Sequence, residues 1–429
     1  MSAPRKPRSR PSRRPSAALD PRLQPLADLD EAALDGLTAP ALAQGKKALA
    51  RVKTAAAEGL GALALHDALG ALLGAHDGQH AAGIRTIVAA LRLASLGLPP
   101  EHSIQPTVAW SLILPASAEW HAGDPNGAWQ LYEEAAAALA LHPSERARDL
   151  HAYAAQQLVR MRSGRDLGEP DFDASRALLE ALMTSAEGRF AAYVRNRALE
   201  AAAVWVCNRE ESRALRKDNA AILELSERAL ALPRGQPNGH TWTFVLHLLG
   251  RRALAYREEG RLADAQASCA EVLSLLPQAT LPRAREHAAW ALAEGAFVAA
   301  DLRERPDEAL PFLLALRRLF APPRNHVEAS ELAYGIAMEV RCAILGERPE
   351  EAARALDDLE RLAAEYPRSA GVRTAVVASR VLRGDLLALR GARAEAIAVW
   401  RAVAEEFEDD PDPARQAESR KAVERMRRG

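Results

Sequence analysis

Small residues recur along this chain at nearly constant intervals, and each is followed four positions later by a residue on the same helical face. The small positions are Ala177, Ala221, Ala265, Ala309, Ala352 and Ala396, and their partners are Ala181, Leu225, Cys269, Leu313, Leu356 and Trp400. The steps between successive small positions are 44, 44, 44, 43 and 44 residues. This period predicts a tandem array of helical units, the alternative being an irregular helical bundle with accidental spacing.

The clearest unit lies between Tyr256 and Pro277. Tyr256 belongs to the end of one helix, Gly260 predicts a tight turn, and a second helix opens at Leu262 and stops at Pro277. Small or apolar residues of the second helix fall on one face, which predicts that this face is buried. They are Ala265, Cys269, Val272 and Leu273.

This order of an aromatic residue, Gly, a small residue, a bulkier apolar residue and Pro resembles the tetratricopeptide repeat. The resemblance is also close between Gly384 and Trp400, where Gly384, Leu387, Gly391, Ala396 and Trp400 keep the order of the family. The resemblance implies an all-α fold, an α-solenoid of stacked antiparallel helical hairpins, and a binding surface along it. The family period is about 34 residues, so the longer interval here implies longer helices and links.

In the tetratricopeptide family, ligands lie along the face lined by the first helix of each hairpin. Carried onto the best-matched repeats, this face holds His247, Arg251 and Glu294, which become candidate partner-binding residues. The alternative is that they are solvated surface residues. Some family members hold a peptide's terminal carboxylate through lysines and asparagines, but residues 187–213 contain no Lys. Binding of a chaperone tail is therefore disfavoured.

The first 18 residues predict a disordered basic arm. Within them stand Arg5, Lys6, Arg8, Arg10, Arg13 and Arg14, with no acidic residue before position 17. Such an arm either solubilises the chain or binds weakly to nucleic acid through phosphate contacts.

Three further segments follow the arm. Residues 19–104 predict helices outside the later period, including one over 41–73 that is either long or a broken pair. Residues 105–410 predict the repeat array, in which Pro115 should kink or break the first helix. Residues 411–429 predict a polar capping helix.

Composition agrees with a helical protein and excludes some partners. The chain has 429 residues, of which 48% are hydrophobic but only 5% aromatic, and its formal net charge is −1. No overall field therefore attracts nucleic acid or an anionic membrane. Three cysteines do not form a disulfide framework, and Cys207, Cys269 and Cys342 are expected to be small core residues in a reducing cytoplasm. No run of 18 apolar residues occurs, so we expect a soluble protein.

Candidate catalytic chemistry is weak. His76 and His80 have the i, i+4 spacing of zinc ligands on a helix, but Asp77 stands where a metalloprotease has Glu, and Gly78 weakens a helix. We expect both histidines to be solvent-exposed turn residues, with a zinc hydrolase as a distant alternative. The sequence contains neither GxxxxGK[ST] nor GxSxG. We therefore expect no catalytic residue, cofactor or metal.

The expected function is that of a cytoplasmic, non-catalytic adaptor that binds a protein or peptide in the groove of the helical array. The alternative is a regulator whose array senses a small molecule or peptide while its basic arm contacts nucleic acid.

Overall fold

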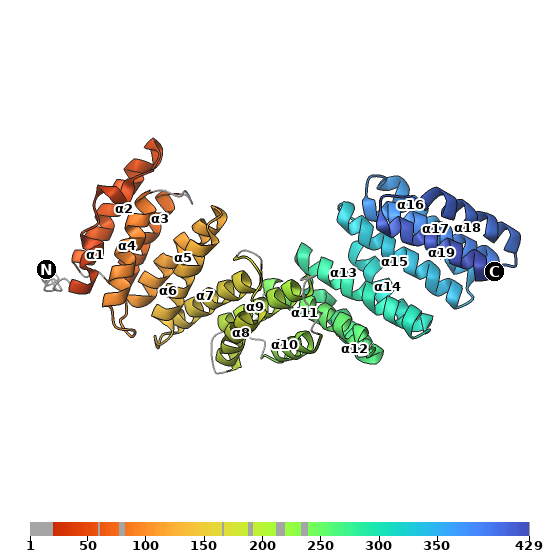
Figure 1. The fold of residues 1–429 in the computed structure, drawn as a ribbon, viewed down its shortest axis with the longest axis horizontal. Coiled ribbons are helices and arrows are strands. Elements are labelled where there is room, and N and C mark those ends of the chain that lie inside the picture. The colour runs from red at the N-terminus through yellow and green to blue at the C-terminus, as the bar shows by residue number, and fades with distance from the viewer. Residues whose placement is uncertain are drawn as a thin grey trace, which may run out of the picture. The chain divides into compact units, whose positions relative to one another are not determined.

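The computed structural model describes residues 20–58, 61–76, 82–164, 167–187, 192–211, 219–232 and 239–428 of the chain. These residues are mainly helical and include no β-strand (Figure 1). Most helices that are neighbours in the sequence pack against each other. The predicted all-α, solenoid-like fold class is therefore confirmed. The predicted basic arm, residues 1–18, lies outside the described residues.

The chain divides into two compact units, residues 1–201 and 202–429, with α9 crossing the boundary. The N-terminal unit holds α1 (Gln24–Ala27), α2 (Ala39–Ala57), α3 (Ala62–Ala75), α4 (Ala82–Gly97), α5 (Gln105–His121), α6 (Pro125–Leu139), α7 (Glu145–Ser163), α8 (Phe172–Glu187) and the start of α9 (Ala192–Glu211). The C-terminal unit continues with α10 (Asn219–Ala231), α11 (Gly239–Glu258), α12 (Leu262–Leu275), α13 (Pro282–Phe297), α14 (Pro306–Phe320), α15 (His326–Leu345), α16 (Pro349–Glu365), α17 (Ala370–Leu389), α18 (Arg393–Phe407) and α19 (Pro413–Arg428). A π-helical turn, Val298–Leu302, extends α13.

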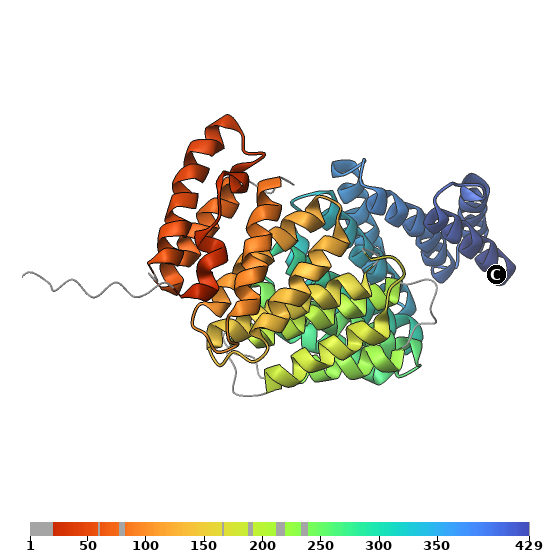
Figure 2. The ribbon, with the colours of Figure 1, turned by 60° about the vertical axis from the view of Figure 1, so that its left-hand side comes forward.

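The C-terminal unit is built from hairpins in which α11 pairs with α12, α13 with α14, α15 with α16, and α17 with α18. The first helix of a hairpin also packs against the first helix of the next, as α15 does against α17. The last helix, α19, packs against both α17 and α18, and the three lie side by side in both ribbon views (Figures 1 and 2). It thus takes the place of a further first helix.

The recurring small residues lie where each second helix crosses its partner. The fourth residue of α12, α14, α16 and α18 is an alanine with no exposed surface: Ala265, Ala309, Ala352 and Ala396. Ala221 of α10 is also buried. The predicted register is wrong at Ala177 and Ala181, which are exposed, because α8 begins at Phe172 and its fourth residue is the buried Ser175. The start of the helix, and not a constant interval, sets the buried position.

The turns inside the hairpins share a left-handed backbone position two residues before the second helix. Gly123, Gly260 and Gly391 occupy it with φ of 86°, 75° and 82°. Glu304 and Glu347 occupy the same position with φ of 54° and 53°. Glycine suits this conformation because it has no Cβ to meet the following carbonyl oxygen, whereas glutamate is strained there. A proline then opens α6, α14 and α16, where its missing N–H is not needed.

The predictions for the N-terminal unit are partly confirmed. The segment predicted as one long helix or a broken pair is the pair α2 and α3. The predicted break at Pro115 is absent, because α5 runs without interruption from Gln105 to His121. Tyr132 of α6 is buried in the core, one turn after the buried Ala128, as the small-then-bulky pattern requires.

Candidate ligand-binding groove

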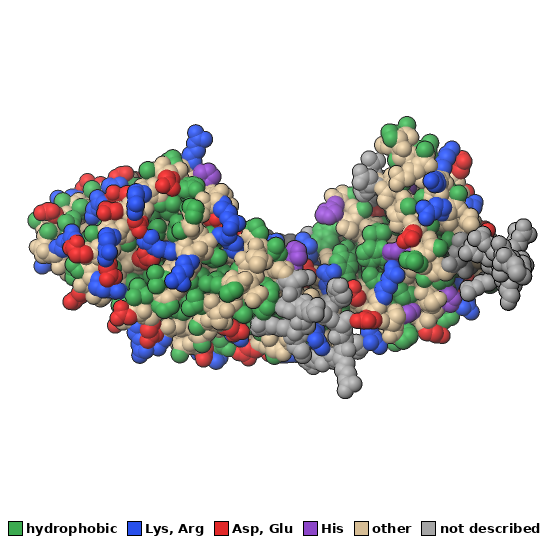
Figure 3. Space-filling view, turned by 180° about the vertical axis from the view of Figure 1, so that it is seen from behind, with side chains coloured by type: hydrophobic (Ala, Val, Ile, Leu, Met, Phe, Trp, Pro, Cys, Tyr) green, Lys and Arg blue, Asp and Glu red, His purple; other side chains and the backbone are tan. Residues whose placement is uncertain are grey.

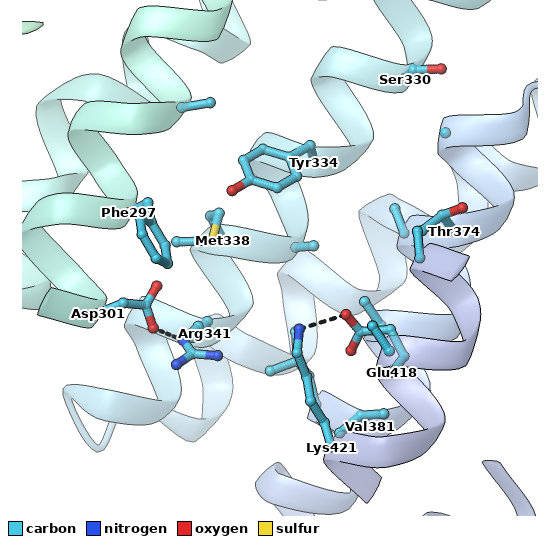
Figure 4. A pocket seen from close by; sticks show the side chains of 18 of the residues that line it. Phe297, Asp301, Ser330, Tyr334, Met338, Arg341, Thr374, Val381, Glu418 and Lys421 are labelled. Atoms are coloured by element: carbon cyan, nitrogen blue, oxygen red, sulfur yellow. Dashed lines mark hydrogen bonds and ion pairs between the residues drawn. The ribbon is translucent and has the colours of Figure 1, made fainter. Parts of the chain in front are cut away.

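A cavity of about 780 Å³ opens between the first helices of the C-terminal unit and α19 (Figure 4). We call it the groove. Its walls come from α13 with its π-helical turn, α15, α17 and α19. The residues that line it are Trp290, Ala293, Glu294, Phe297, Asp301, Ser330, Glu331, Tyr334, Ala337, Met338, Arg341, Gly371, Thr374, Ala375, Ala378, Val381, Leu382, Asp385, Ala414, Ala417, Glu418, Lys421 and Arg425.

Helical spacing explains how the sequence assembles this lining. On α15, the groove residues Glu331, Tyr334, Met338 and Arg341 follow one another at intervals of three or four, so they share one face. The opposite side of α15 carries the buried Ile336, Val340 and Ala343, and α15 packs against α16. The helix α15 therefore divides its surface between the hairpin core and the groove.

The apolar part of the lining is extensive, and Tyr334 is its most exposed aromatic residue. Figure 4 shows Phe297, Tyr334 and Met338 pointing towards the same space from α13 and α15, with Val381 across from them on α17. Tyr334 remains 44% exposed although its ring is large and mostly apolar. A ligand that covered this ring would remove apolar surface from water, which favours binding.

Charged side chains of the groove are mostly paired. Asp301 pairs with Arg341, and Lys421 Nζ lies 2.6 Å from Glu418 Oε1 (Figure 4). The Asp385 carboxylate is 3.1 Å from the Arg425 guanidinium. Burial raises the pKa of Asp301 and of Asp385, and their arginine partners oppose this effect. The Asp301–Arg341 pair joins the π-helical turn after α13 to α15, and the Asp385–Arg425 pair joins α17 to α19, whereas Glu418 and Lys421 both belong to α19.

Two carboxylates stand nearer the other end of the groove. Glu294 Oε1 lies 2.7 Å from Arg257 Nε, and burial raises the pKa of this carboxyl group. Glu331 is partly buried, and desolvation together with the neighbouring Glu286 raises its pKa. Tyr334 lies close to both carboxylates. Burial and the charges of Glu294, Asp301 and Glu331 raise the pKa of Tyr334 to about 12, so its hydroxyl stays protonated at neutral pH.

The three residues that the family resemblance selected lie around Trp290. Glu294 lines the groove one turn after Trp290, and the Arg251 guanidinium lies 4.9 Å from the centre of the Trp290 ring. His247 is buried between α11 and α13, with its Nδ1 3.3 Å from Nδ1 of His287. The sequence reasoning missed Glu331, Tyr334 and the contribution of α19. The sequence did contain a signal for them. Each first helix carries polar and aromatic residues on the face that points away from its partner in the hairpin.

The remaining candidates have structural contacts. His76 was expected to be exposed, but it is buried, and its Nε2 lies 3.0 Å from the carbonyl oxygen of Ala33. His80 lies outside the described residues. Within the described ranges, no three His, Cys, Asp or Glu side chains gather as metal ligands would. Cys269 and Cys342 are buried as predicted, whereas Cys207 is partly exposed.

Comparisons with known proteins do not assign a family. No protein-family model matches the chain, and no match to it occurs among the curated proteins. Among the described residues, none of the helices combines the length and the hydropathy needed to cross a bilayer.

Proposed function

We propose that this chain is a non-catalytic adaptor that binds a peptide segment of a protein partner in the groove between α13, α15, α17 and α19. The observation that carries the proposal is the groove itself, a cavity of about 780 Å³ with a mixed aromatic, aliphatic and charged lining. Ligand sites usually have volumes of about 300–1,000 Å³ and combine an apolar surface with a few polar groups. The resemblance to tetratricopeptide repeats supports the same face, because first helices carry the ligands there.

The dimensions of the groove favour a short peptide. The groove follows α13 and its π-helical turn from Trp290 to Asp301, which corresponds to about 16 Å of helix. An extended chain covers that length in about five residues. On the face of the C-terminal unit drawn in Figure 3, acidic and basic side chains are interspersed, so this face has no broad field of one sign that would favour a nucleic acid.

A selection of random 12-residue peptides displayed on phage tests the proposal with the full chain as bait. Ala417 lines the groove from α19, and Ala417→Trp would fill the cavity with an indole ring. Ala364→Trp on the exposed surface of α16 is the matched control. We expect peptides that bind the wild-type chain and the control but not Ala417→Trp. If no peptide is enriched, or if enriched peptides bind all three proteins equally, the groove is not a peptide site.

A further inference from the structure

We infer that the peptide presents a Lys or Arg side chain to Glu331, next to Tyr334, with an apolar residue beside it. This inference rests on the proposed function, and it adds the chemistry that the groove selects. It is carried by an imbalance of charge along the groove and by an aromatic ring that is open to a ligand.

The charges are balanced at the end of the groove formed by the later turns of the helices. The carboxylates there are Asp301, Asp385 and Glu418, and the cations are Arg341, Lys421 and Arg425. Each carboxylate has a cation as its partner. A ligand charge at this end would have to compete with an ion pair that already exists.

The other end carries an excess of negative charge. Glu294 has Arg257 as its partner, but Glu331 has no hydrogen bond or ion pair with any residue that the structure describes. Glu286 on α13 is close enough to act on Glu331 and adds a further negative charge. A partly buried carboxylate without a partner is costly, and a cation from a ligand would compensate it. An anionic group would instead face the carboxylates of Glu294 and Glu331, which line the groove.

An open aromatic ring lies beside these carboxylates. The rings of Trp290 and Phe297 are already covered by cations of the chain, Arg251 at 4.9 Å and Arg257 at 5.6 Å from the ring centres. In the described part of the chain no Lys or Arg stacks on Tyr334, which is 44% exposed. A guanidinium or ammonium group over this ring would gain a cation–π contact in addition to the carboxylates.

The neighbouring lining determines what should stand beside the basic residue. From Tyr334, the groove continues over Met338 and Phe297 towards Val381 (Figure 4). Met338 is 7% exposed and Val381 4%, so Tyr334 and the partly exposed Phe297 offer most of the apolar surface to an aliphatic or aromatic side chain. The recognised element is therefore a basic residue and an apolar residue close together in the peptide.

The experiment uses peptides that the wild-type chain enriches from the random library and compares two carboxamide variants. Glu331→Gln removes the unpaired charge and keeps the shape, whereas Glu395→Gln alters an exposed glutamate on α18, outside the groove. We expect the enriched peptides to share a Lys or Arg next to an apolar residue. Glu331→Gln should weaken their binding about tenfold and reduce its salt dependence, and Glu395→Gln should leave both unchanged. Replacing the peptide's Arg by citrulline, or its Lys by norleucine, should weaken binding to the wild-type chain by a similar factor.

The outcomes separate this inference from the proposed function. Peptides that Ala417→Trp excludes, but that share no basic residue or bind Glu331→Gln as well as Glu395→Gln, would overturn the inference and leave peptide binding in place. If no peptide enriched by the wild-type chain loses binding to Ala417→Trp, both the inference and the proposed function are wrong.

Discussion

The left-handed backbone position in the hairpin turns allows a test of the repeat. Two substitutions at this position should have opposite effects on the free energy of unfolding. Gly391 precedes α18 with φ of 82°, and Glu347 precedes α16 with φ of 53°. A Cβ added at Gly391 meets no atom within 4 Å, so Gly391→Ala changes the backbone energy and creates no clash. The exposed Glu347 forms no ion pair with another described residue, so Glu347→Gly loses no such contact.

The magnitude follows from two opposing terms. A left-handed backbone costs an L-residue about 1–2 kcal/mol relative to glycine. Glycine loses about 0.5–1 kcal/mol more conformational free energy on folding than alanine does. Gly391→Ala should therefore lower the free energy of unfolding by about 1 kcal/mol, and Glu347→Gly should raise it by about 0.5–1 kcal/mol.

Urea denaturation followed by circular dichroism at 222 nm measures both changes against the wild-type chain. Equal m-values for the three proteins would show that the midpoints report stability. If Gly391→Ala is neutral while Glu347→Gly destabilises the chain, the shared backbone position does not govern these turns. The hairpins could then no longer be treated as equivalent on the basis of this backbone position.

Two further predictions concern the core and the pH dependence. Ala265→Phe should overpack a fully buried position in α12 and lower the free energy of unfolding by about 1–3 kcal/mol. Ala263→Phe, on the exposed side of the same helix, should lower it little. Equal urea midpoints for the two variants would refute the register of this hairpin. Burial, with Arg283 and Arg251 nearby, lowers the pKa of His287 to about 4 from its ordinary 6.5, so the unfolded chain takes up more protons than the folded chain between these values. The free energy of unfolding should therefore fall as the pH drops through this window, and His287 should account for about 2 kcal/mol of the fall between pH 7 and pH 5. The His287→Asn variant, unfolded at the same two pH values, should show a smaller fall. An equal fall in the variant would mean that His287 titrates normally.

The sequence predicted the hairpins best where short-range chemistry decides the structure. The small residue at Ala265 and its partner Cys269 are both fully buried, and Gly260 adopts the left-handed turn that its position suggested. The register failed at Ala177, since the buried Ser175 of α8 precedes Ala221 by 46 residues and not 44. No periodicity reports the length of a link.

The site was harder to predict because it is formed between repeats. Glu294 was selected by its place on a first helix, and it does line the groove. Glu331 and Tyr334 differ little in the sequence from solvated helical residues, and only the packing of α13, α15 and α17 brings their side chains to one cavity. Lys421 and Ala417 belong to a helix expected to cap the array, and its role as a wall depends on how α19 lies against α17.

The helix α19 is both the last helix of the array and a wall of the groove. Binding of a ligand in the groove is therefore coupled to whether α19 is docked. Only Ser419 and Ala422 of α19 are buried, with Val423 and Met426 partly so, whereas Ala414, Ala417, Glu418, Lys421 and Arg425 face the groove. Such a helix detaches more readily than the hairpins before it, because little apolar surface holds it. The apparent affinity of any ligand that touches α19 is then scaled by the fraction of molecules in which the helix is docked. By the same thermodynamic cycle, a bound ligand slows amide exchange along α19 even at residues it never touches.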